Sequence, residues 1–235
     1  MLAKPFIKWV GGKSQLLEEI SEKYPQKIEK YCEPFVGGGA VLFDILNTKH
    51  PETVLINDIN KELINTYSQI KNNCTGMISH LSEIQSIYKA HTLEENKAFF
   101  YEKRQRYNDL KVNGNDAENL EKAALFIFLN KTCFNGLYRV NSKGLFNVPF
   151  NNAKNPLLCD EELNIESEYI FNKRINHHDN SKVLNNQMTS YYKECEEGFT
   201  LLSSYGNVTN SYALDLYFEK GYKLVFLSLE CSRRQ

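Results

Sequence analysis

The sequence predicts an α/β fold built on a doubly wound parallel sheet, and three observations lead to that prediction. Residues 31–36 and 53–56 are short apolar segments with the length of buried strands. Turn residues follow each of them, and a segment with helical spacing follows each turn. The order strand, helix, strand, helix is typical of parallel sheets whose strands are joined by crossover helices.

The first strand runs into three consecutive glycines, Gly37, Gly38 and Gly39, and an apolar helix is expected at 40–46. Glycine lets a backbone approach a ligand closely, and a helix N-terminus presents unpaired N–H groups to a carboxylate or phosphate. The turn therefore indicates a ligand site at the end of the first strand.

The second strand ends at Asp58, 21 residues after Gly37. An acid at this place can accept hydrogen bonds from the two hydroxyls of a ribose, so turn and acid together indicate an adenosine-containing cofactor. The alternative is that Asp58 caps the helix expected to begin near Lys61. The full Gly-x-Gly-x-x-Gly pattern is absent, which argues against a nicotinamide dinucleotide at this turn.

A helical lobe is expected after the second strand, because residues 61–130 show helical patterns and no convincing strand. In residues 131–150, turn pairs such as Asn135-Gly136 and Lys143-Gly144 interrupt short runs at 137–140 and 145–148, which predicts a β-hairpin. We therefore expect residues 1–60 and 151–235 to form the α/β domain. Residues 61–150 would form an inserted lobe that ends in the hairpin.

Length and composition are those of one globular domain with a smaller lobe, since 42% of the 235 residues are hydrophobic. The longest uninterrupted apolar run, 123–129, is far shorter than the roughly 20 residues of a membrane span, and no signal peptide is recognisable. A cytoplasmic location is therefore expected. The six cysteines form no Cys-x-x-Cys pair, so we expect free thiols and no metal site.

Positive charge gathers in two windows without acids, residues 1–17 and 131–154, although the formal net charge is only −1. Their basic residues are Lys4, Lys8, Lys13, Lys131, Arg139, Lys143 and Lys154. The rest of the chain carries 21 basic and 29 acidic residues. A basic surface on an acidic body suits a polyanion, although ordinary solvated loops would give the same windows.

Five blocks of sequence carry a more specific signal. They are Lys4-Pro-Phe-Ile-Lys-Trp-Val-Gly-Gly-Lys13, Glu33-Pro-Phe-Val-Gly-Gly-Gly-Ala40, Ile56-Asn-Asp-Ile-Asn60, Asn135-Gly-Leu-Tyr-Arg-Val-Asn141 and Phe146-Asn-Val-Pro-Phe150. In this order, from residue 4 to about 162, they resemble the Dam/DpnM-like DNA adenine-N6 methyltransferases. The resemblance implies a Rossmann-like sheet with an inserted helical and β-hairpin DNA-recognition lobe.

The same resemblance implies S-adenosylmethionine as cofactor, S-adenosylhomocysteine as its product, and double-stranded DNA as partner. It assigns Trp9 and Lys13 to an N-terminal cofactor motif, Phe35 with Gly37, Gly38 and Gly39 to the methionine part, and Asp58 with its neighbour Ile59 to the ribose side. Each of the first two residues has an alternative role. Trp9 could be an ordinary core side chain, and Lys13 could be a solvated lysine in a first helical turn. A cation is unfavourable at a helix N-terminus, which favours a functional Lys13.

DNA-reading residues are implied in the stretch that matches the family's recognition hairpin, namely Phe134, Asn135, Leu137, Arg139 and Asn141. The resemblance implies Lys8, in the N-terminal block, as a further base contact. Arg139 would bind a guanine edge with two hydrogen bonds, Leu137 would touch a thymine methyl, and Phe134 would stack or wedge. For Asn141, Asn147 and Pro149, the alternative is that they only hold the hairpin in shape.

The catalytic residues stay unassigned. Methyltransferases of this group carry Asp-Pro-Pro-Tyr, whose carboxylate and prolyl carbonyl accept the N–H bonds of the adenine amine, while the tyrosine stacks on the flipped base. None of the six prolines of this chain is adjacent to another. Residues 188–193, 197–200 and 206–212 still resemble the family's last third, but too few residues separate them for a helix and a strand.

Two explanations follow: an inactive relative, or an enzyme whose internal segments are missing from this sequence. The second predicts consecutive Cα atoms separated by far more than about 3.8 Å near residues 184–190 and 200–210.

The leading function is methylation of adenine in a short duplex site, GATC or a relative, by a monomeric, nucleoid-associated enzyme. A dead DNA- or cofactor-binding relative is second, and a small-molecule enzyme, which the acid-free hairpin argues against, is third.

Overall fold

The computed structural model describes residues 2–33, 35–159, 175–177, 199–204 and 224–228. Its elements in chain order are η1 (Lys13–Leu16), α1 (Leu17–Ser21), β1 (Lys30–Glu33), α2 (Ala40–Thr48), β2 (Thr53–Ile56), α3 (Lys61–Asn72), α4 (Cys74–Ala90), α5 (Leu93–Asn113), η2 (Asp116–Glu118), α6 (Asn119–Thr132), η3 (Phe134–Gly136), β3 (Ile175–His177), β4 (Phe199–Ser204) and β5 (Leu224–Ser228). The protein is a helix-rich α/β structure with a small parallel sheet.

Within the described ranges the sheet has five strands in the order β3-β2-β1-β4-β5, and every pair of neighbours among them is parallel. In the register of β1 and β2, Tyr31 lies opposite Val54 and Glu33 lies opposite Ile56. Consecutive residues of both strands are buried, which means that both faces of the sheet are covered there. The sequence order changes direction between β1 and β4, so the loop after β1 lies where the sheet can hold a ligand.

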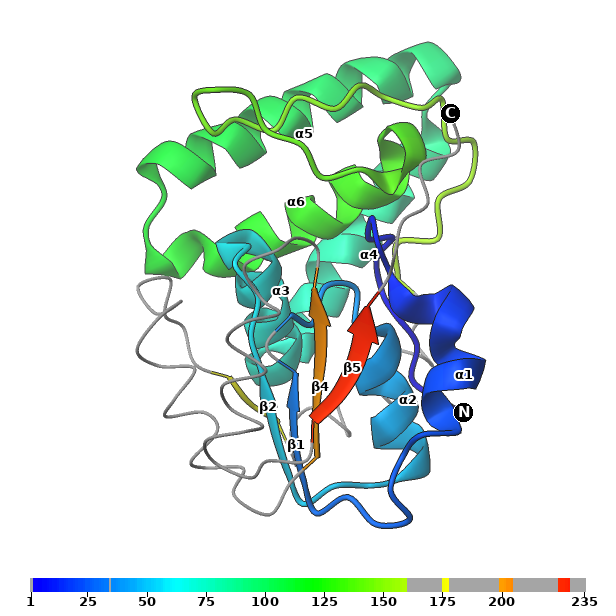
Figure 1. Ribbon diagram of the computed structural model, residues 1–235. Coiled ribbons are helices and arrows are strands. Elements are labelled where there is room, and N and C mark those ends of the chain that lie inside the picture. The colour runs from blue at the N-terminus through cyan, green and yellow to red at the C-terminus, as the bar shows by residue number, and fades with distance from the viewer. Residues whose placement is uncertain (1, 34, 160–174, 178–198, 205–223, 229–235) are drawn as a thin grey trace.

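Helices α5 and α6 lie beyond the end to which β4 and β5 point (Figure 1). Helix α6 packs against α3, α4 and α5. Its residues 123–130 are all buried, as is typical of a helix that is apolar on every side. The prediction that residues 61–130 are helical is confirmed.

Polar side chains cap the N-termini of helices that follow β2 in the chain. The Asn60 side chain accepts the Leu63 N–H at 3.0 Å and so caps α3. Thr92 and Glu95 form a capping box at the start of α5. Asn60 and not Asp58 is therefore the helix cap, and the alternative reading of Asp58 as that cap is wrong.

Three predicted elements differ from the structure. The first strand is shorter than 31–36, because the Val36 carbonyl accepts the Gly39 N–H and residue 36 already belongs to the turn. The helix expected at 40–46 runs two residues further, to Thr48. The hairpin runs antiparallel but meets only at isolated bridges, Val140 with Phe146 and Cys133 with Phe150.

The hairpin lacks regular strands for a packing reason. A strand turns successive side chains to opposite faces, whereas the consecutive residues Leu137 and Tyr138 both pack against the core. Asn135, just before Gly136 and Leu137, has a left-handed φ of 55°, which lies outside the range of regular strand residues.

Four cysteines of the described residues, Cys32, Cys74, Cys133 and Cys159, are buried thiols. Within the same ranges, no helix has the length and apolarity of a membrane span, and no three His, Cys, Asp or Glu side chains gather to hold a metal ion.

The chain break expected near 184–190 lies outside the described residues. So does the break expected between about 200 and 210, except for the end of β4. The family-like fragments at 188–193 and 206–212 also lie outside the described residues. Of the fragment at 197–200, only the two residues that begin β4 are described.

Candidate functional site

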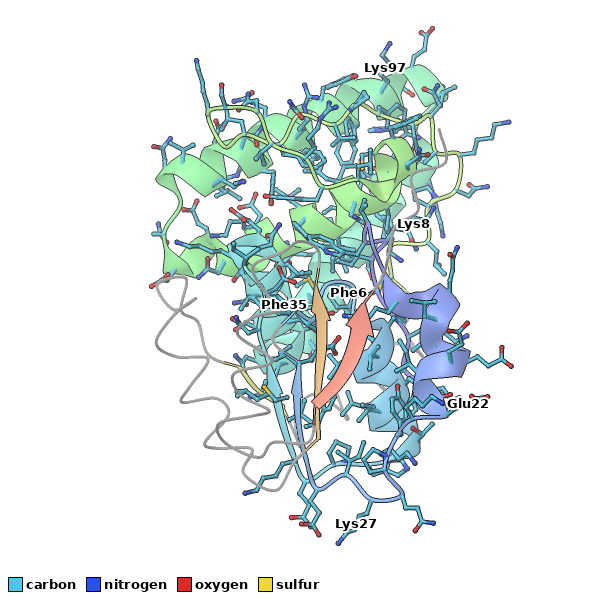
Figure 2. The ribbon with its side chains drawn as sticks, viewed as in Figure 1. Phe6, Lys8, Glu22, Lys27, Phe35 and Lys97 are labelled. Carbon is cyan, nitrogen blue, oxygen red and sulfur yellow. The ribbon has the colours of Figure 1, made fainter. Side chains whose placement is uncertain are left out.

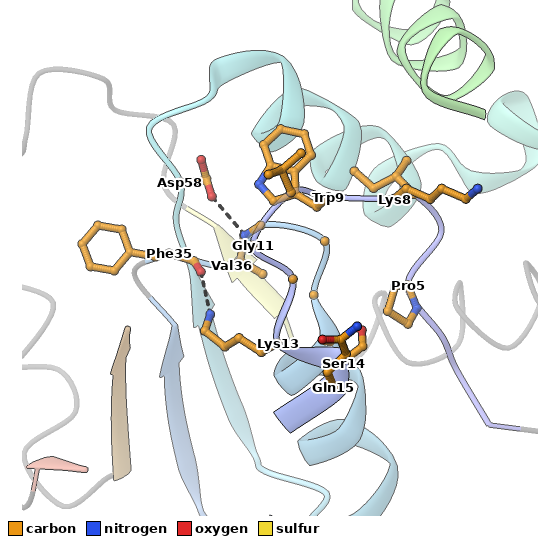
Figure 3. Close-up of a pocket in the computed structure, with 17 residues that line it drawn as sticks. Pro5, Lys8, Trp9, Gly11, Lys13, Ser14, Gln15, Phe35, Val36 and Asp58 are labelled. Carbon is orange, nitrogen blue, oxygen red and sulfur yellow. Dashed lines mark hydrogen bonds between the residues drawn. The ribbon is translucent and has the colours of Figure 1, made fainter. Parts of the chain in front are cut away.

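A pocket of about 710 Å³ opens beside the loop that follows β1. It lies between this loop and the N-terminal segment that leads into η1 (Figure 3). Phe6, Lys8 and Phe35 lie near the middle of the molecule, between Lys97 on the helices at the top and Lys27 at the bottom (Figure 2). The volume lies within the range of about 300–1,000 Å³ that small-molecule sites usually have.

The pocket brings together most of the side chains predicted to bind a cofactor. Those that line it are Trp9, Lys13, Phe35, Gly37, Gly38, Gly39 and Asp58. Lys8, predicted to contact DNA, lines it as well. Ile59 does not, and its side chain is 75% exposed. One residue of the predicted DNA-binding set and seven residues of the predicted cofactor-binding set therefore line the same pocket.

The glycine turn is packed so closely that side chains have no room there. A Cβ on Gly37 would lie 2.8 Å from Trp9 Cδ1, and one on Gly39 would lie 2.5 Å from Tyr67 Oη. Gly39 also has a φ of +81°, which other residues adopt only with strain. The Tyr67 hydroxyl donates to the Gly37 carbonyl at 2.9 Å and so holds the turn from the side of α3.

Trp9 packs against the core and also borders the pocket. Its ring stacks on Tyr138 at a centroid distance of 5.9 Å and an interplanar angle of 24°, and it also packs against Phe126. At the same time it borders the pocket. Trp9 is therefore a partly buried core side chain that also forms a wall of the pocket.

Lys13 is not a solvated lysine, because only 8% of it is exposed. Its Nζ donates to Glu33 Oε1 at 3.2 Å and to the Phe35 carbonyl at 3.2 Å. Glu33 also accepts a hydrogen bond from the Tyr31 hydroxyl at 2.8 Å. The short helix η1 carries this lysine to the end of β1, where its charge is paired inside the protein.

Glu33 and Tyr31 were not among the predicted site residues. Burial raises the pKa of the Glu33 carboxyl, while Lys13 and the Tyr31 hydroxyl act in the opposite direction. The available signal was an acid inside an apolar strand that leads into the glycine turn, since a buried acid needs a partner. Nothing in the local pattern pointed to Lys13 as that partner.

Asp58 organises the loops at the ends of β1 and β2. Its Oδ2 accepts the Gly37 N–H at 3.0 Å, and its Oδ1 accepts the Asn60 N–H at 2.9 Å. Burial raises the pKa of Asp58, and the backbone N–H groups of Asn60 and Gly37 oppose that rise. The carboxylate is thus held rigidly at the pocket wall, where it can accept further hydrogen bonds.

Apart from Lys8, the predicted DNA-reading residues lie on the hairpin, and their surroundings differ. Phe134 is 51% exposed, whereas Leu137 packs partly against the core. Arg139 is exposed, and its Nε donates to Asn147 Oδ1 at 2.8 Å. Asn135 is exposed and adopts the left-handed backbone conformation.

Asn141 holds the tip of the hairpin. Its Oδ1 accepts the N–H groups of Lys143 at 2.9 Å and Leu145 at 3.0 Å. The Pro149 carbonyl similarly accepts the Phe134 N–H at 2.9 Å. These contacts are the scaffolding role that the sequence left open for Asn141 and Pro149.

Comparison with known proteins identifies the family to which the sequence is similar. Residues 9–192 match the family model described as D12 class N6 adenine-specific DNA methyltransferase. The chain is 46% identical over 167 residues to the type II methyltransferase M.MjaIII of Methanocaldococcus jannaschii, covering 69% of this chain and 57% of that protein.

Two further relatives agree. The type II methyltransferase M1.LlaDCHI of Lactococcus lactis is 38% identical over 83% of this chain and 62% of its own length. The DNA adenine methylase of Haemophilus influenzae is 38% identical over 68% of this chain and 51% of its own length. The chain therefore spans only about half to three fifths of these relatives. Because the family model matches most of its residues, the chain belongs to the D12 class N6 adenine-specific DNA methyltransferases.

Proposed function

We propose that this protein transfers a methyl group from S-adenosylmethionine to N6 of adenine in a short duplex DNA site, GATC or a relative. The observation that carries the proposal is the pocket beside the glycine turn, which gathers seven of the eight predicted cofactor residues. The names of the relatives support the reaction class, since two are type II methyltransferases and one is a DNA adenine methylase.

In this proposal Asp58 accepts hydrogen bonds from the ribose, and Phe35 with the three glycines encloses the methionine part. Trp9 supplies an aromatic wall, Lys13 a fixed charge, and Ile59 an apolar side chain on the exposed side of Asp58. The fit rests on two observations: the turn has no room for side chains, and the carboxylate at its edge is held by backbone N–H groups. S-adenosylmethionine supplies the methyl group when it is bound.

The proposed DNA contacts lie on the hairpin and on Lys8. Arg139 reads a guanine edge, Leu137 a thymine methyl, and Phe134 stacks or wedges as the target adenine leaves the duplex. Asn135 and Asn141 shape this surface, and Lys8 reaches it from the pocket side. The exposure of Phe134 and Arg139 supports the assignment, because a base-reading side chain must be accessible.

The proposal includes an architecture. Residues 1–60 and 151–235 form a Rossmann-like, doubly wound cofactor domain, and residues 61–150 form the target-recognition lobe. The strand order, which reverses between β1 and β4, supports a doubly wound sheet. We further propose that the enzyme works as a cytoplasmic, nucleoid-associated monomer.

One observation favours a second candidate, a catalytically inactive relative that binds cofactor or DNA. The adenine amine is a weak nucleophile, and the family's Asp-Pro-Pro-Tyr supplies the acceptors that activate it. This sequence contains no Pro-Pro pair. The inactive candidate keeps the pocket and the hairpin and lacks the chemistry.

Calorimetric titration of S-adenosylmethionine, followed by a methyl-transfer assay on GATC duplex DNA, tests both candidates. Binding followed by transfer to adenine supports the enzyme. Binding without transfer to any duplex supports the inactive relative. A folded protein that binds neither S-adenosylmethionine nor duplex DNA would contradict both.

A further inference from the structure

The side chain of Asn130 joins the segment that borders the pocket to the loop that enters the hairpin. Asn130 lies on α6 and is 4% exposed. Its Oδ1 accepts the Lys8 N–H at 2.9 Å. Its Nδ2 donates to the Lys8 carbonyl at 2.8 Å and to the Gly136 carbonyl at 2.8 Å. One buried amide thus binds two backbone segments at once.

The two segments carry both halves of the proposed site. Lys8 lines the pocket and precedes Trp9, whereas Gly136 lies between Asn135 and Leu137 of the DNA-reading set. They also touch directly, since a Cβ on Gly136 would lie only 2.6 Å from Lys8 Cβ. Moving one segment without the other would break these hydrogen bonds and leave buried polar groups unpaired, which is costly.

A ring contact reinforces the same connection. Trp9 packs against the glycine turn on one side and stacks on Tyr138 of the hairpin on another. Tyr138 directly precedes Arg139. The pocket wall and the DNA-reading loop are therefore held together at two neighbouring points, of which Asn130 is the hydrogen-bonded one.

We propose that Asn130 is a positioning residue that couples occupancy of the cofactor pocket to the conformation of the DNA-reading loop. The inference rests on the proposed function, because it assumes that the pocket binds cofactor and that the hairpin binds DNA. A ligand that orders residues 8–13 also orders residues 133–137 through this amide. By thermodynamic linkage, cofactor then raises DNA affinity by the same factor by which DNA raises cofactor affinity.

The test measures that factor by calorimetry, as the Kd of S-adenosylhomocysteine without and with a saturating GATC duplex. S-adenosylhomocysteine carries no methyl group to transfer, so no reaction disturbs the titration. We expect a factor of about fivefold or more in the wild-type protein. In Asn130→Asp an oxygen replaces the donating amide and faces two carbonyl oxygens, and the factor should fall below about twofold.

Asn108→Asp is the matched control. Asn108 is also buried, and its side chain accepts the Phe146 N–H at 2.8 Å and donates to the Phe146 carbonyl at 3.1 Å. It holds the same hairpin but does not touch the pocket segment, so its coupling factor should stay at the wild-type value. An unchanged factor in folded Asn130→Asp, or an equal loss in both variants, overturns the inference.

A second measurement needs no variant. Hydrogen–deuterium exchange of the wild-type protein should show that S-adenosylhomocysteine alone protects amides of residues 133–137 as well as those of the pocket. Protection confined to residues 5–15 and 35–39 overturns the coupling even if Asn130→Asp fails to fold. A wild-type protein that binds no S-adenosylhomocysteine refutes the proposed function instead, so the two failures are distinguishable.

Discussion

The pocket and the hairpin hold their charged residues in opposite ways. At the pocket, Lys13 is buried and its ammonium is paired with Glu33 inside the protein. On the hairpin, Arg139 is exposed and, among the residues that the structure describes, donates only to Asn147 of the same loop, through Nε at 2.8 Å and Nη2 at 3.4 Å. A buried pair is fixed before any ligand arrives, whereas an exposed guanidinium can exchange its partner for another.

This difference matches what each region would have to recognise. A cofactor of constant shape suits a pocket that is formed in advance. A DNA sequence is read by side chains that commonly change rotamer as they meet base edges. The same contrast predicts that replacing the buried lysine at the pocket lowers stability, while replacing the exposed arginine on the hairpin changes discrimination between DNA sequences.

Lys13→Met should have the largest effect. It leaves the buried carboxylate of Glu33 without its cation, and we expect the free energy of unfolding to fall by about 3–5 kcal/mol at neutral pH. Urea unfolding monitored by circular dichroism measures the loss. Arg106→Met is the control, because Arg106 pairs with Glu118 and Glu121 at the surface and should contribute about 1 kcal/mol or less. Equal losses in the two variants would contradict the contrast.

The loss in Lys13→Met should also depend on pH. Burial raises the pKa of Glu33, and removing the cation raises it further. A carboxyl whose pKa is higher in the folded state binds more protons when folded, so stability falls as pH rises through about 4.3, its ordinary pKa. The deficit should therefore shrink when the same unfolding experiment is repeated toward pH 4. A deficit that is constant between pH 4 and pH 7 would argue against an unpaired Glu33 charge.

Gly39→Ala and Gly144→Ala compare the two regions directly, because both glycines have a positive φ, +81° and +75°. A Cβ on Gly39 also collides with Tyr67, whereas one on Gly144 meets nothing within 4 Å. We expect losses of about 2–4 kcal/mol and about 1–2 kcal/mol respectively, measured by thermal unfolding. A Gly39→Ala protein as stable as Gly144→Ala would mean that the turn is loosely packed.

Asp58→Ala should weaken S-adenosylmethionine binding by about 1.5–3 kcal/mol, because it removes a charged hydrogen-bond acceptor from the pocket wall. Calorimetry measures the change, and Asp109→Ala on the exposed side of α5 serves as the control. If cofactor affinity is unchanged in a correctly folded Asp58→Ala protein, the proposed ribose contact does not exist.

Arg139→Ala should act on a different property. It should lower discrimination at one guanine by about 1–3 kcal/mol while leaving cofactor affinity in the absence of DNA unchanged. Competition binding between GATC duplexes and singly substituted duplexes measures this. Equal weakening for all duplexes would show that Arg139 contacts only phosphate.

The local sequence pattern was sufficient to predict those elements whose signals lie within a few neighbouring residues. We could predict the strand at 53–56, the glycine turn and the helices between 61 and 130, since strand length, helical spacing and glycine runs reflect local backbone preferences. The hairpin was placed correctly along the chain. Its lack of regular strands was not predictable, because Leu137 and Tyr138 are both drawn onto a core built by distant helices.

Tertiary structure alone decided the partners within the site. Lys13 and Glu33 are 20 residues apart, and Asn130 reaches Lys8 across 122 residues, so neither contact leaves a periodic trace in the sequence. Such pairs form because the parallel sheet and the buried helix α6 bring distant segments to one place. Once these segments are packed there, burial makes each polar group need a partner. The sequence by itself determined which chemical groups are available, and the packing of strands and helices determined which of them meet.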